Sequence, residues 1–293
     1  MNILVTGSNG QLGSEIKNLS SDYPEYNFFF EDSKNLDITD IEKIKFYILN
    51  NKIQVVINCA AYTKVDKAEV EKVKAEKVNY IGVSNLIKAI ELVGGKLIHI
   101  STDYVFNGEN VLPYKEEDKV SPINVYGRTK LKGEEEVLKS SVEAIIIRTS
   151  WLYSIYGNNF VKTMLRLGKE KQELNVVYDQ IGVPTYAKDL SKICLNIIKQ
   201  SKGRIDEKSK IYHFSNEGVT SWYDFAKAIM ELSKIDCKIY PIETKQYPTP
   251  AKRPSYSLLN SSKIKEDFDI EIPYWRDSLM NCIERIKAIK KPM

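Results

Sequence analysis

Residues 2–13 read NILVTGSNGQLG, a short apolar run that passes directly into a glycine-rich loop. Glycines stand at positions 7, 10 and 13, and residues with helical spacing follow. A dinucleotide site needs such glycines, because the chain must turn sharply, admit a pyrophosphate to its backbone and pack the helix close to the sheet. The helix N-terminus offers free N–H groups to the phosphates. The alternative is a simple tight turn. The residues predicted to bind the dinucleotide here are Gly7, Ser8, Asn9, Gly10, Gln11, Leu12 and Gly13.

The rest of the first half alternates short apolar runs with longer amphipathic stretches, which is the pattern of βαβ units around a parallel sheet. The apolar runs are nearly continuous, as expected of strands covered on both faces. The predicted strands are 2–5, 27–30, 54–58, 96–100 and 143–148, and the predicted helices are 12–20, 41–50, 68–93 and 125–140. The predicted fold class is α/β, a Rossmann-like doubly wound parallel sheet with a smaller C-terminal substrate-binding lobe.

After Arg148 the rhythm changes to an aromatic and polar segment, followed by loops that contain prolines. We expect a helix near 161–169, and we expect 189–199 and 210–214 to return to the sheet as a helix and a strand. The predicted domains are therefore a dinucleotide-binding domain, 1–150 with 187–214 returning to it, and a substrate-binding lobe, 151–186 and 215–293.

The composition is that of an ordinary globular enzyme and excludes a disordered or fibrous chain. Of 293 residues, 43% are hydrophobic and 28% are charged, and the net charge is +4. So small and dispersed a charge gives no reason to expect nucleic-acid binding. The four cysteines are far apart and accompanied by two histidines, so we expect no metal site and no disulfide framework. No apolar stretch approaches the ~20 residues of a membrane span. The N-terminus lacks a secretory signature, so we expect a cytoplasmic protein.

Acidic residues stand at the end of the second predicted strand, where Glu31 is followed by Asp32. An acidic group about 20 residues beyond the glycine loop is placed to bond the adenosine ribose of the dinucleotide. No basic residue within 31–33 is available for a 2′-phosphate, although Lys34 is close. The sequence thus favours NADH without excluding NADPH. For each acid, a solvated turn carboxylate is the alternative.

Hydroxyl groups stand at the carboxyl end of the fourth predicted strand, where open α/β sheets place their ligands. Thr102 is one of them, and Tyr126 and Lys130 follow at i and i+4 spacing on one helix face. A phenol is a poor acid or base near neutral pH unless a nearby cation favours its phenolate. Lys130 can supply that field, and Thr102 can hold the reacting oxygen by a hydrogen bond. With the glycine loop, these three residues predict hydride transfer, in which Tyr126 and Lys130 also contact the dinucleotide.

The glycine loop, the strand-end hydroxyls and the Tyr126–Lys130 pair resemble the extended short-chain dehydrogenase/reductases, over nearly the whole chain in order and spacing. From the residues alone, Asp37 is equally well explained as the N-cap of the following helix. The further cofactor-binding residues that the resemblance implies are Asp37, Ile38, Ala60, Ala61, Thr63 and Asn79, the last as a support of the active site.

Longer segments resemble one group in this family, the dTDP-4-dehydrorhamnose reductases. These segments are 101–106, 148–153, 157–164, 179–185 and 253–254. Such enzymes use NADH or NADPH to reduce the 4-keto group of dTDP-4-dehydro-6-deoxy-L-mannose, giving dTDP-L-rhamnose for cell-surface polysaccharide synthesis. The resemblance implies that Tyr126 protonates the nascent alkoxide, that Thr102 polarises the carbonyl, and that Lys130 holds the ribose and lowers the pKa of the phenol.

The residues after Thr102 separate this group from sugar-nucleotide 4,6-dehydratases, which the chain also resembles. Dehydratases carry an Asp-Glu pair at this point, because eliminating water needs an additional acid and base. This chain has Asp103 and Tyr104 there. The missing Glu favours simple reduction, and both residues are expected to contact the substrate.

The remaining predicted substrate contacts lie mostly in the second lobe. Trp151 offers a rigid apolar face to a sugar ring, and Arg253 can bind a diphosphate through its planar fork. Asparagines can bond hydroxyls or phosphate. The alternatives are core filler for Trp151, a turn for the asparagines and a surface charge for Arg253. The full set is Val65, Trp151, Asn158, Asn159 and Arg253.

Two other functions are compatible with the sequence. One is another nucleotide-sugar 4-reductase or a 4-epimerase, and the other is a non-catalytic, reductase-like regulatory subunit, which the intact Tyr126 and Lys130 disfavour. We expect a monomer or a homodimer that binds a small nucleotide sugar. Some relatives pair through a divalent cation, but Glu15 alone does not establish such a site, so no metal ligand is assigned.

Overall fold

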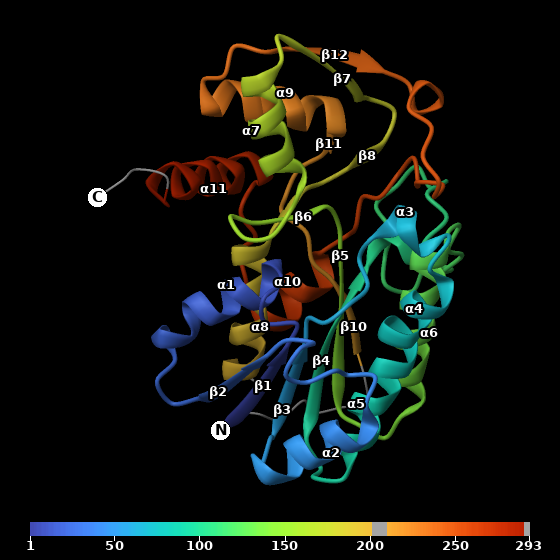
Figure 1. The fold of residues 1–293 in the computed structure, drawn as a ribbon, viewed down its shortest axis with the longest axis vertical. Coiled ribbons are helices and arrows are strands. Elements are labelled where there is room, and N and C mark those ends of the chain that lie inside the picture. Colours follow the sequence, from blue (N-terminus) through green and yellow to red (C-terminus); the bar gives the residue numbers. More distant parts are fainter. Residues whose placement is uncertain (201–209, 290–293) are drawn as a thin grey trace.

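The computed structural model describes residues 1–200 and 210–289, which form two lobes stacked along the long axis (Figure 1). In the described residues, the larger lobe contains a six-stranded sheet with the order β10-β5-β4-β3-β1-β2, and every neighbouring pair is parallel. The strands are β1 (Asn2–Thr6), β2 (Asn27–Glu31), β3 (Val55–Asn58), β4 (Lys96–Thr102), β5 (Ala144–Thr149) and β10 (Lys210–His213). The predicted parallel sheet is confirmed.

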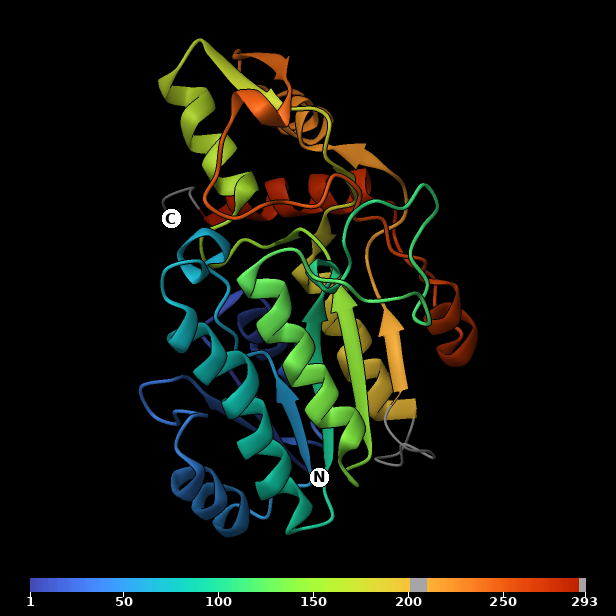
Figure 2. The same ribbon diagram turned by 90° about the vertical axis from the view of Figure 1, so that its right-hand side faces the viewer.

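Helices cover both faces of this sheet, which explains the continuous apolar runs of its strands (Figure 2). One face carries α1 (Gln11–Leu19) and α8 (Ala187–Gln200), and the other carries α2 (Ile41–Asn50), α5 (Gly82–Glu91) and α6 (Val125–Lys139). Alternate strand residues point to opposite faces. Ile3 and Val5 accordingly pack with the residues of α1 and α8, and Leu4 packs with those of α2 and α5. The doubly wound fold is therefore confirmed.

The single helix predicted over 68–93 is wrong. The segment divides into α3 (Val65–Ala68), α4 (Lys72–Glu76), a π-helical turn (Lys77–Ile81) and α5. The π turn contains Asn79, whose side chain is fully buried and bonds to a neighbouring loop. Such a turn inserts a residue into the helical ladder and is frequent at functional sites. Amphipathic spacing does not reveal it, because the apolar positions continue on both sides.

The smaller lobe surrounds an aromatic core that includes Tyr153, Tyr186, Phe225 and Trp275. The helix predicted near 161–169 is present as α7. The helices of this lobe are α7 (Phe160–Glu170), α9 (Trp222–Ser233) and α11 (Trp275–Ile289). Its paired strands are β7 (Glu173–Val177) with β12 (Lys238–Ile242), β8 (Ile181–Gly182) with β11 (Thr220–Ser221), and β6 (Leu152–Tyr153) with β9 (Thr185–Tyr186). None of the helices in the described ranges is long and apolar enough to cross a membrane.

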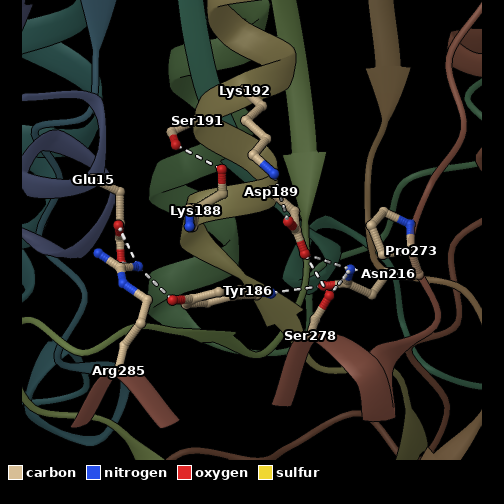
Figure 3. A network of polar contacts seen from close by, with 10 residues as sticks. All are labelled: Glu15, Tyr186, Lys188, Asp189, Ser191, Lys192, Asn216, Pro273, Ser278 and Arg285. Carbon is tan, nitrogen blue, oxygen red and sulfur yellow. Dashed lines mark hydrogen bonds and ion pairs between the residues drawn. The ribbon is translucent and has the colours of Figure 1, made fainter. Parts of the chain in front are cut away.

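Buried polar contacts join the lobes (Figure 3). Asp189 of α8 accepts hydrogen bonds from the Asn216 amide at 3.0 Å and from Ser278 at the start of α11. Beside them, Arg285 of α11 donates to Glu15 of α1 at 2.9 Å. Since Glu15 and Asp189 are at most 7% exposed, these bonds are shielded from water. They fix α11 of the smaller lobe against α1 and α8 of the larger one.

Candidate active site

The glycine loop forms a tight cradle at the carboxyl end of β1. Gly7 has φ +63°, and a Cβ on it would lie 2.7 Å from the Ala60 nitrogen. A Cβ on Gly13 would lie 2.6 Å from the Ser8 Cα. Helix α1 follows Gly10, which provides no side-chain cap, so the first N–H groups of the helix remain available to a ligand. The cradle fits an anionic pyrophosphate, because the glycines leave room and the helix end supplies donors.

The acidic residues at the end of β2 have different partners. Glu31 accepts a hydrogen bond from the Tyr47 hydroxyl at 2.7 Å. Asp32 accepts from the Asn9 side chain and from the Lys34 backbone N–H, the latter at 2.9 Å. The Lys34 backbone bond is the main cause that lowers the pKa of Asp32. The Asn9–Asp32 contact joins the glycine loop to the end of β2, so the two predicted parts of the dinucleotide site lie side by side.

Asp37 does not cap helix α2. Its Oδ1 accepts from the Thr39 N–H at 2.9 Å, whereas the cap is Asp40, which accepts from the Lys43 N–H at 3.2 Å. The alternative interpretation of Asp37 as the N-cap is therefore wrong, and its contact with the cofactor stays a prediction. The neighbouring Ile38 is buried against α5, where a Cβ on Gly82 would meet its side chain.

Asn79 holds the loop that follows β3. Its amide accepts from the Tyr62 N–H at 2.8 Å and donates to the Tyr62 carbonyl at 3.1 Å. It also donates to Thr129 of α6 at 3.0 Å. This loop carries the predicted cofactor-binding residues Ala60, Ala61 and Thr63. Asn79 thus ties the loop to the helix that bears Tyr126 and Lys130.

Thr102 and Tyr126 come together at the carboxyl end of β4. Thr102 donates to the Asp103 carboxylate at 2.9 Å and accepts from the Tyr104 N–H at 3.2 Å. Asn124 caps α6 by accepting from the Gly127 N–H at 2.8 Å, which places Tyr126 in the first turn of the helix. The Tyr104 and Tyr126 rings meet edge to face at 5.5 Å. The structure therefore brings the two predicted catalytic hydroxyls to one point.

Burial keeps the Tyr126 phenol protonated. It raises the pKa of the phenol well above its usual value; the hydrogen bond with Thr102 lowers this pKa, and the Asp103 and Tyr104 charges raise it. The Lys130 Nζ donates to the Ile100 carbonyl at 2.7 Å. The lowering of the phenol pKa by Lys130 stays a prediction. A protonated phenol is nevertheless what a carbonyl reduction requires as proton donor.

Arg253 lies at the rim of a cleft of about 500 Å³ next to the active site. Its guanidinium donates to the Asp66 carboxylate at 2.7 Å and to the Tyr104 hydroxyl at 3.3 Å. Asp66 also accepts from the Ala251 N–H at 3.3 Å, so it fixes both the side chain and the loop. The sequence reasoning missed Asp66, although it stands beside the predicted contact Val65 at the start of α3. The cleft is lined by Asn107, Glu109, Ile123, Asp179, Thr244, Tyr247, Pro248, Thr249, Pro250, Ala251, Lys252, Arg253 and Ser255.

The other predicted substrate residues lie between β5 and α7. Trp151 stacks on Trp222 with ring centroids 3.7 Å apart, which covers one of its two faces. Asn159 caps α7 by accepting from the Lys162 N–H at 3.0 Å, and its amide donates to Gln11 at 2.9 Å. Asn158 is exposed. The Asn159 amide is therefore already engaged by the fold, and the substrate roles of all three residues stay predictions.

The Glu15 carboxylate has protein partners. It accepts from Ser154 at 2.7 Å as well as from Arg285. Across residues 1–200 and 210–289, no group of three or more His, Cys, Asp or Glu is arranged to hold a metal ion. The four cysteines, all within these ranges, are free thiols.

Comparisons with known proteins extend along nearly the whole chain. The family model described as "RmlD substrate binding domain" matches residues 1–288. The chain is 42% identical to a dTDP-4-dehydrorhamnose reductase of Aggregatibacter actinomycetemcomitans, over 95% of this chain and 97% of the relative. A solved dTDP-4-dehydrorhamnose reductase from Clostridium acetobutylicum ATCC 824 has a TM-score of 0.91 at 42% identity, covering 98% and 100% of the two chains. The enzyme from Bacillus anthracis str. Ames, solved in complex with NADP, also has a TM-score of 0.91, at 40% identity and 97% and 99% coverage.

Proposed function

This chain belongs to the RmlD family, and we propose that it reduces the 4-keto group of dTDP-4-dehydrorhamnose with NADPH or NADH, giving dTDP-L-rhamnose. The observation that carries this function is the meeting of Thr102 and Tyr126 at the carboxyl end of β4, with Lys130 one helical turn further on. The glycine cradle that suits a dinucleotide opens at the same edge of the sheet.

Tyr126 is the proton donor of the reaction. When bound, NAD(P)H supplies the hydride that adds to C4 of the sugar. The 4-oxygen then takes the phenolic proton of Tyr126, so the ketone becomes a secondary alcohol, and the resulting phenolate regains a proton from solvent. Thr102 holds the same oxygen by a hydrogen bond, and Lys130 holds the ribose of the dinucleotide. The buried position of Tyr126 favours this direction of proton transfer, because it keeps the phenol protonated.

Arg253 binds the diphosphate of the nucleotide sugar. A guanidinium makes paired hydrogen bonds to phosphate oxygens, and the Asp66 carboxylate holds this guanidinium at the rim of the cleft. Tyr104, which shares a hydrogen bond with Arg253 and lies against Tyr126, spans the distance between the diphosphate and the reacting sugar. Trp151 contacts the sugar.

The adenosine ribose of the dinucleotide lies beside Asp32 and Glu31. Their carboxylates favour NADH, since they repel a 2′-phosphate at close range. A relative at 40% identity was solved with NADP, so either cofactor fits the family. We keep both as cofactors of this chain.

The dinucleotide and the substrate are assigned to different lobes. We assign residues 1–150, with 187–214, to the dinucleotide-binding domain, and 151–186 with 215–293 to the substrate-binding lobe. Helix α10 (Ser262–Phe268) departs from this division, because it packs against α8 and β10 of the larger lobe. The position of β10 beside β5 and the packing of α8 in the core of the larger lobe support this division. We propose a monomer or homodimer that works in the cytoplasm, where NAD(P)H is supplied.

The test is NADPH or NADH oxidation with a panel of nucleotide 4-keto sugars. We expect consumption of cofactor with dTDP-4-dehydrorhamnose, and a lower kcat/KM when the base or the sugar is changed. If a different keto sugar gives the highest kcat/KM, the substrate assignment is wrong while the reductase assignment stands.

A further inference from the structure

A row of buried polar side chains crosses the sheet beneath Lys130. Thr6, Asn58 and His99 are register neighbours on β1, β3 and β4. They are 1%, 1% and 0% exposed. Two residues earlier, the same face of these strands is apolar and carries Leu4, Val56 and Leu97. The change from apolar to polar occurs at the last residues of β1 and β3 and in the middle of β4, and it places this row against the α6 lysine.

The hydrogen bonds of the row have a fixed direction. The Asn58 Oδ1 accepts from the Ala60 N–H at 3.2 Å and from the Thr6 hydroxyl at 2.7 Å. The Asn58 Nδ2 therefore faces the His99 Nδ1, at 3.1 Å. An amide nitrogen only donates, so the His99 Nδ1 accepts. Burial, and then the Lys130 charge, hold the pKa of His99 well below its usual range. The ring is neutral, and its single proton is on Nε2.

The nitrogen that carries this proton contacts Lys130. The His99 Nε2 lies 3.5 Å from the Lys130 Nζ. An ammonium has three N–H donors and no acceptor, so a charged Lys130 sets donor against donor at this contact. A neutral amine has a lone pair that accepts from the Nε2–H while the amine still donates to the Ile100 carbonyl at 2.7 Å. The imidazole therefore favours the neutral amine.

The other groups around Lys130 give its charge little compensation. Lys130 is 2% exposed. Glu134, one turn along α6, attracts the charge, but its carboxylate already accepts from the Arg148 guanidinium at 2.7 Å and 3.0 Å. Cys59 faces the lysine from the loop after β3, and burial raises the pKa of this thiol so that it stays neutral. Burial lowers the pKa of Lys130 to about 8.

We propose that His99 holds Lys130 close to its neutral form, and that binding of NADPH or NADH is coupled to the uptake of one proton by Lys130. The lysine Nζ takes this proton from solvent and becomes an ammonium; no covalent bond to the dinucleotide forms. The dinucleotide favours the ammonium because ribose hydroxyls accept hydrogen bonds from it. His99 and Asn58 are then positioning residues, which act on the cofactor through Lys130. The inference rests on the proposed function only in the identity of the dinucleotide.

The experiment measures NADPH binding to the full chain without any sugar, over about pH 7.5 to 9.5. We expect the dissociation constant to rise by up to about tenfold per pH unit above pH 8. Calorimetry in two buffers of different ionisation enthalpy should show the uptake of up to one proton for each NADPH bound. This uptake should be largest near about pH 8.5 to 9. This part uses the unaltered chain, so it does not depend on the folding of a variant.

Three variants assign the effect. Lys130→Met should bind NADPH more weakly and with no pH dependence over this range. His99→Leu keeps a buried side chain at this position and removes the Nε2–H, so the pH at which binding weakens should rise. Lys132→Met removes a solvent-facing lysine from the same helix, one that pairs with Glu76, and should leave the profile unchanged.

Three results would overturn the inference: a dissociation constant that stays constant over the range, pH dependence that survives in Lys130→Met, or a His99→Leu profile identical to that of the unaltered chain. Because no sugar is present, failure to reduce dTDP-4-dehydrorhamnose would leave these measurements unaffected. The proposed function and this inference are therefore tested separately.

Discussion

Gly7 and Gly13 of the dinucleotide cradle belong to one short segment, whereas Arg253 and its partner Asp66 are 187 positions apart in the chain. The cradle is defined by backbone shape, because glycine is needed where a Cβ would collide with Ala60 or Ser8. The Arg253 site is defined by side chains that meet across the two lobes. The dinucleotide side of the active site is thus local and the sugar-nucleotide side is composite.

This difference has a consequence for mutations. A change in the cradle acts on backbone geometry, so it should weaken binding of the dinucleotide and leave binding of the sugar nucleotide unchanged. A change at Arg253 should do the reverse. Tyr126 lies where the two sides meet, and its loss should affect the chemical step without weakening either ligand strongly.

The largest expected effect is that of Tyr126→Phe. Removing the phenolic proton donor should lower kcat by roughly 10²- to 10⁴-fold, the range typical of general acid catalysis. The dissociation constant for NADPH should change little, because the ring and its contact with Tyr104 remain. Stopped-flow measurement of NADPH oxidation, with a fluorescence titration of NADPH, checks both. An undiminished kcat would remove Tyr126 from the mechanism.

Gly7→Ala should weaken binding of the dinucleotide alone. The substitution places a Cβ 2.7 Å from the Ala60 nitrogen and strains a backbone at φ +63°, so NADPH binding should weaken roughly tenfold or more. Gly94→Ala is the matched control, because Gly94 has φ +59° with no atom within 4 Å of the added Cβ. Equal NADPH binding in the two variants would mean that the cradle is not the pyrophosphate site.

Arg253→Lys should weaken binding of the sugar nucleotide alone. Lysine keeps the charge but loses the fork that reaches Asp66 and Tyr104. We expect the KM for the nucleotide sugar to rise roughly tenfold, with an unchanged KM for NADPH. Arg166→Lys, at a solvent-exposed pair with Glu170, is the control and should leave both constants within about twofold. A rise in the KM for NADPH would instead place Arg253 on the dinucleotide side.

The smallest expected effect is that of Asn159→Ala, which separates the two interpretations of the asparagine pair. Loss of the α7 cap should lower the free energy of unfolding by about 1 kcal/mol. Asn158→Ala, at an exposed position, should change it by less than about 0.5 kcal/mol. Urea unfolding of both variants measures this. A raised KM in Asn159→Ala without loss of stability would favour substrate binding over capping.

Sequence predicted well whatever depends on neighbours along the chain. The sheet, the glycine loop and the Tyr126–Lys130 pair each follow from local spacing, and the return of 210–214 to the sheet follows from its apolar run. The break in the helix predicted over 68–93 was missed, because a π turn leaves the amphipathic pattern almost intact. Asp37 was a poor candidate for the cap because Asp40 stands closer to the start of α2.

The residues that sequence reasoning missed act through partners far along the chain. The role of Asp66 depends on its contact with Arg253, and the role of His99 depends on its contacts with Asn58 and Lys130. A signal for the second group did exist. Thr6 and Asn58 are polar residues at the carboxyl ends of β1 and β3, and His99 interrupts the apolar run of β4. Open α/β sheets collect their functional groups at the carboxyl ends of their strands.

The measurement that tests the central claim most directly is the stoichiometry of NADPH oxidation with dTDP-4-dehydrorhamnose as the only sugar. The account predicts one dTDP-L-rhamnose formed for each NADPH consumed, and no product without added NADPH or NADH. Formation of a new nucleotide sugar without net consumption of cofactor, as an epimerase would give, would contradict it. So would the absence of NADPH oxidation by a folded protein that binds both ligands.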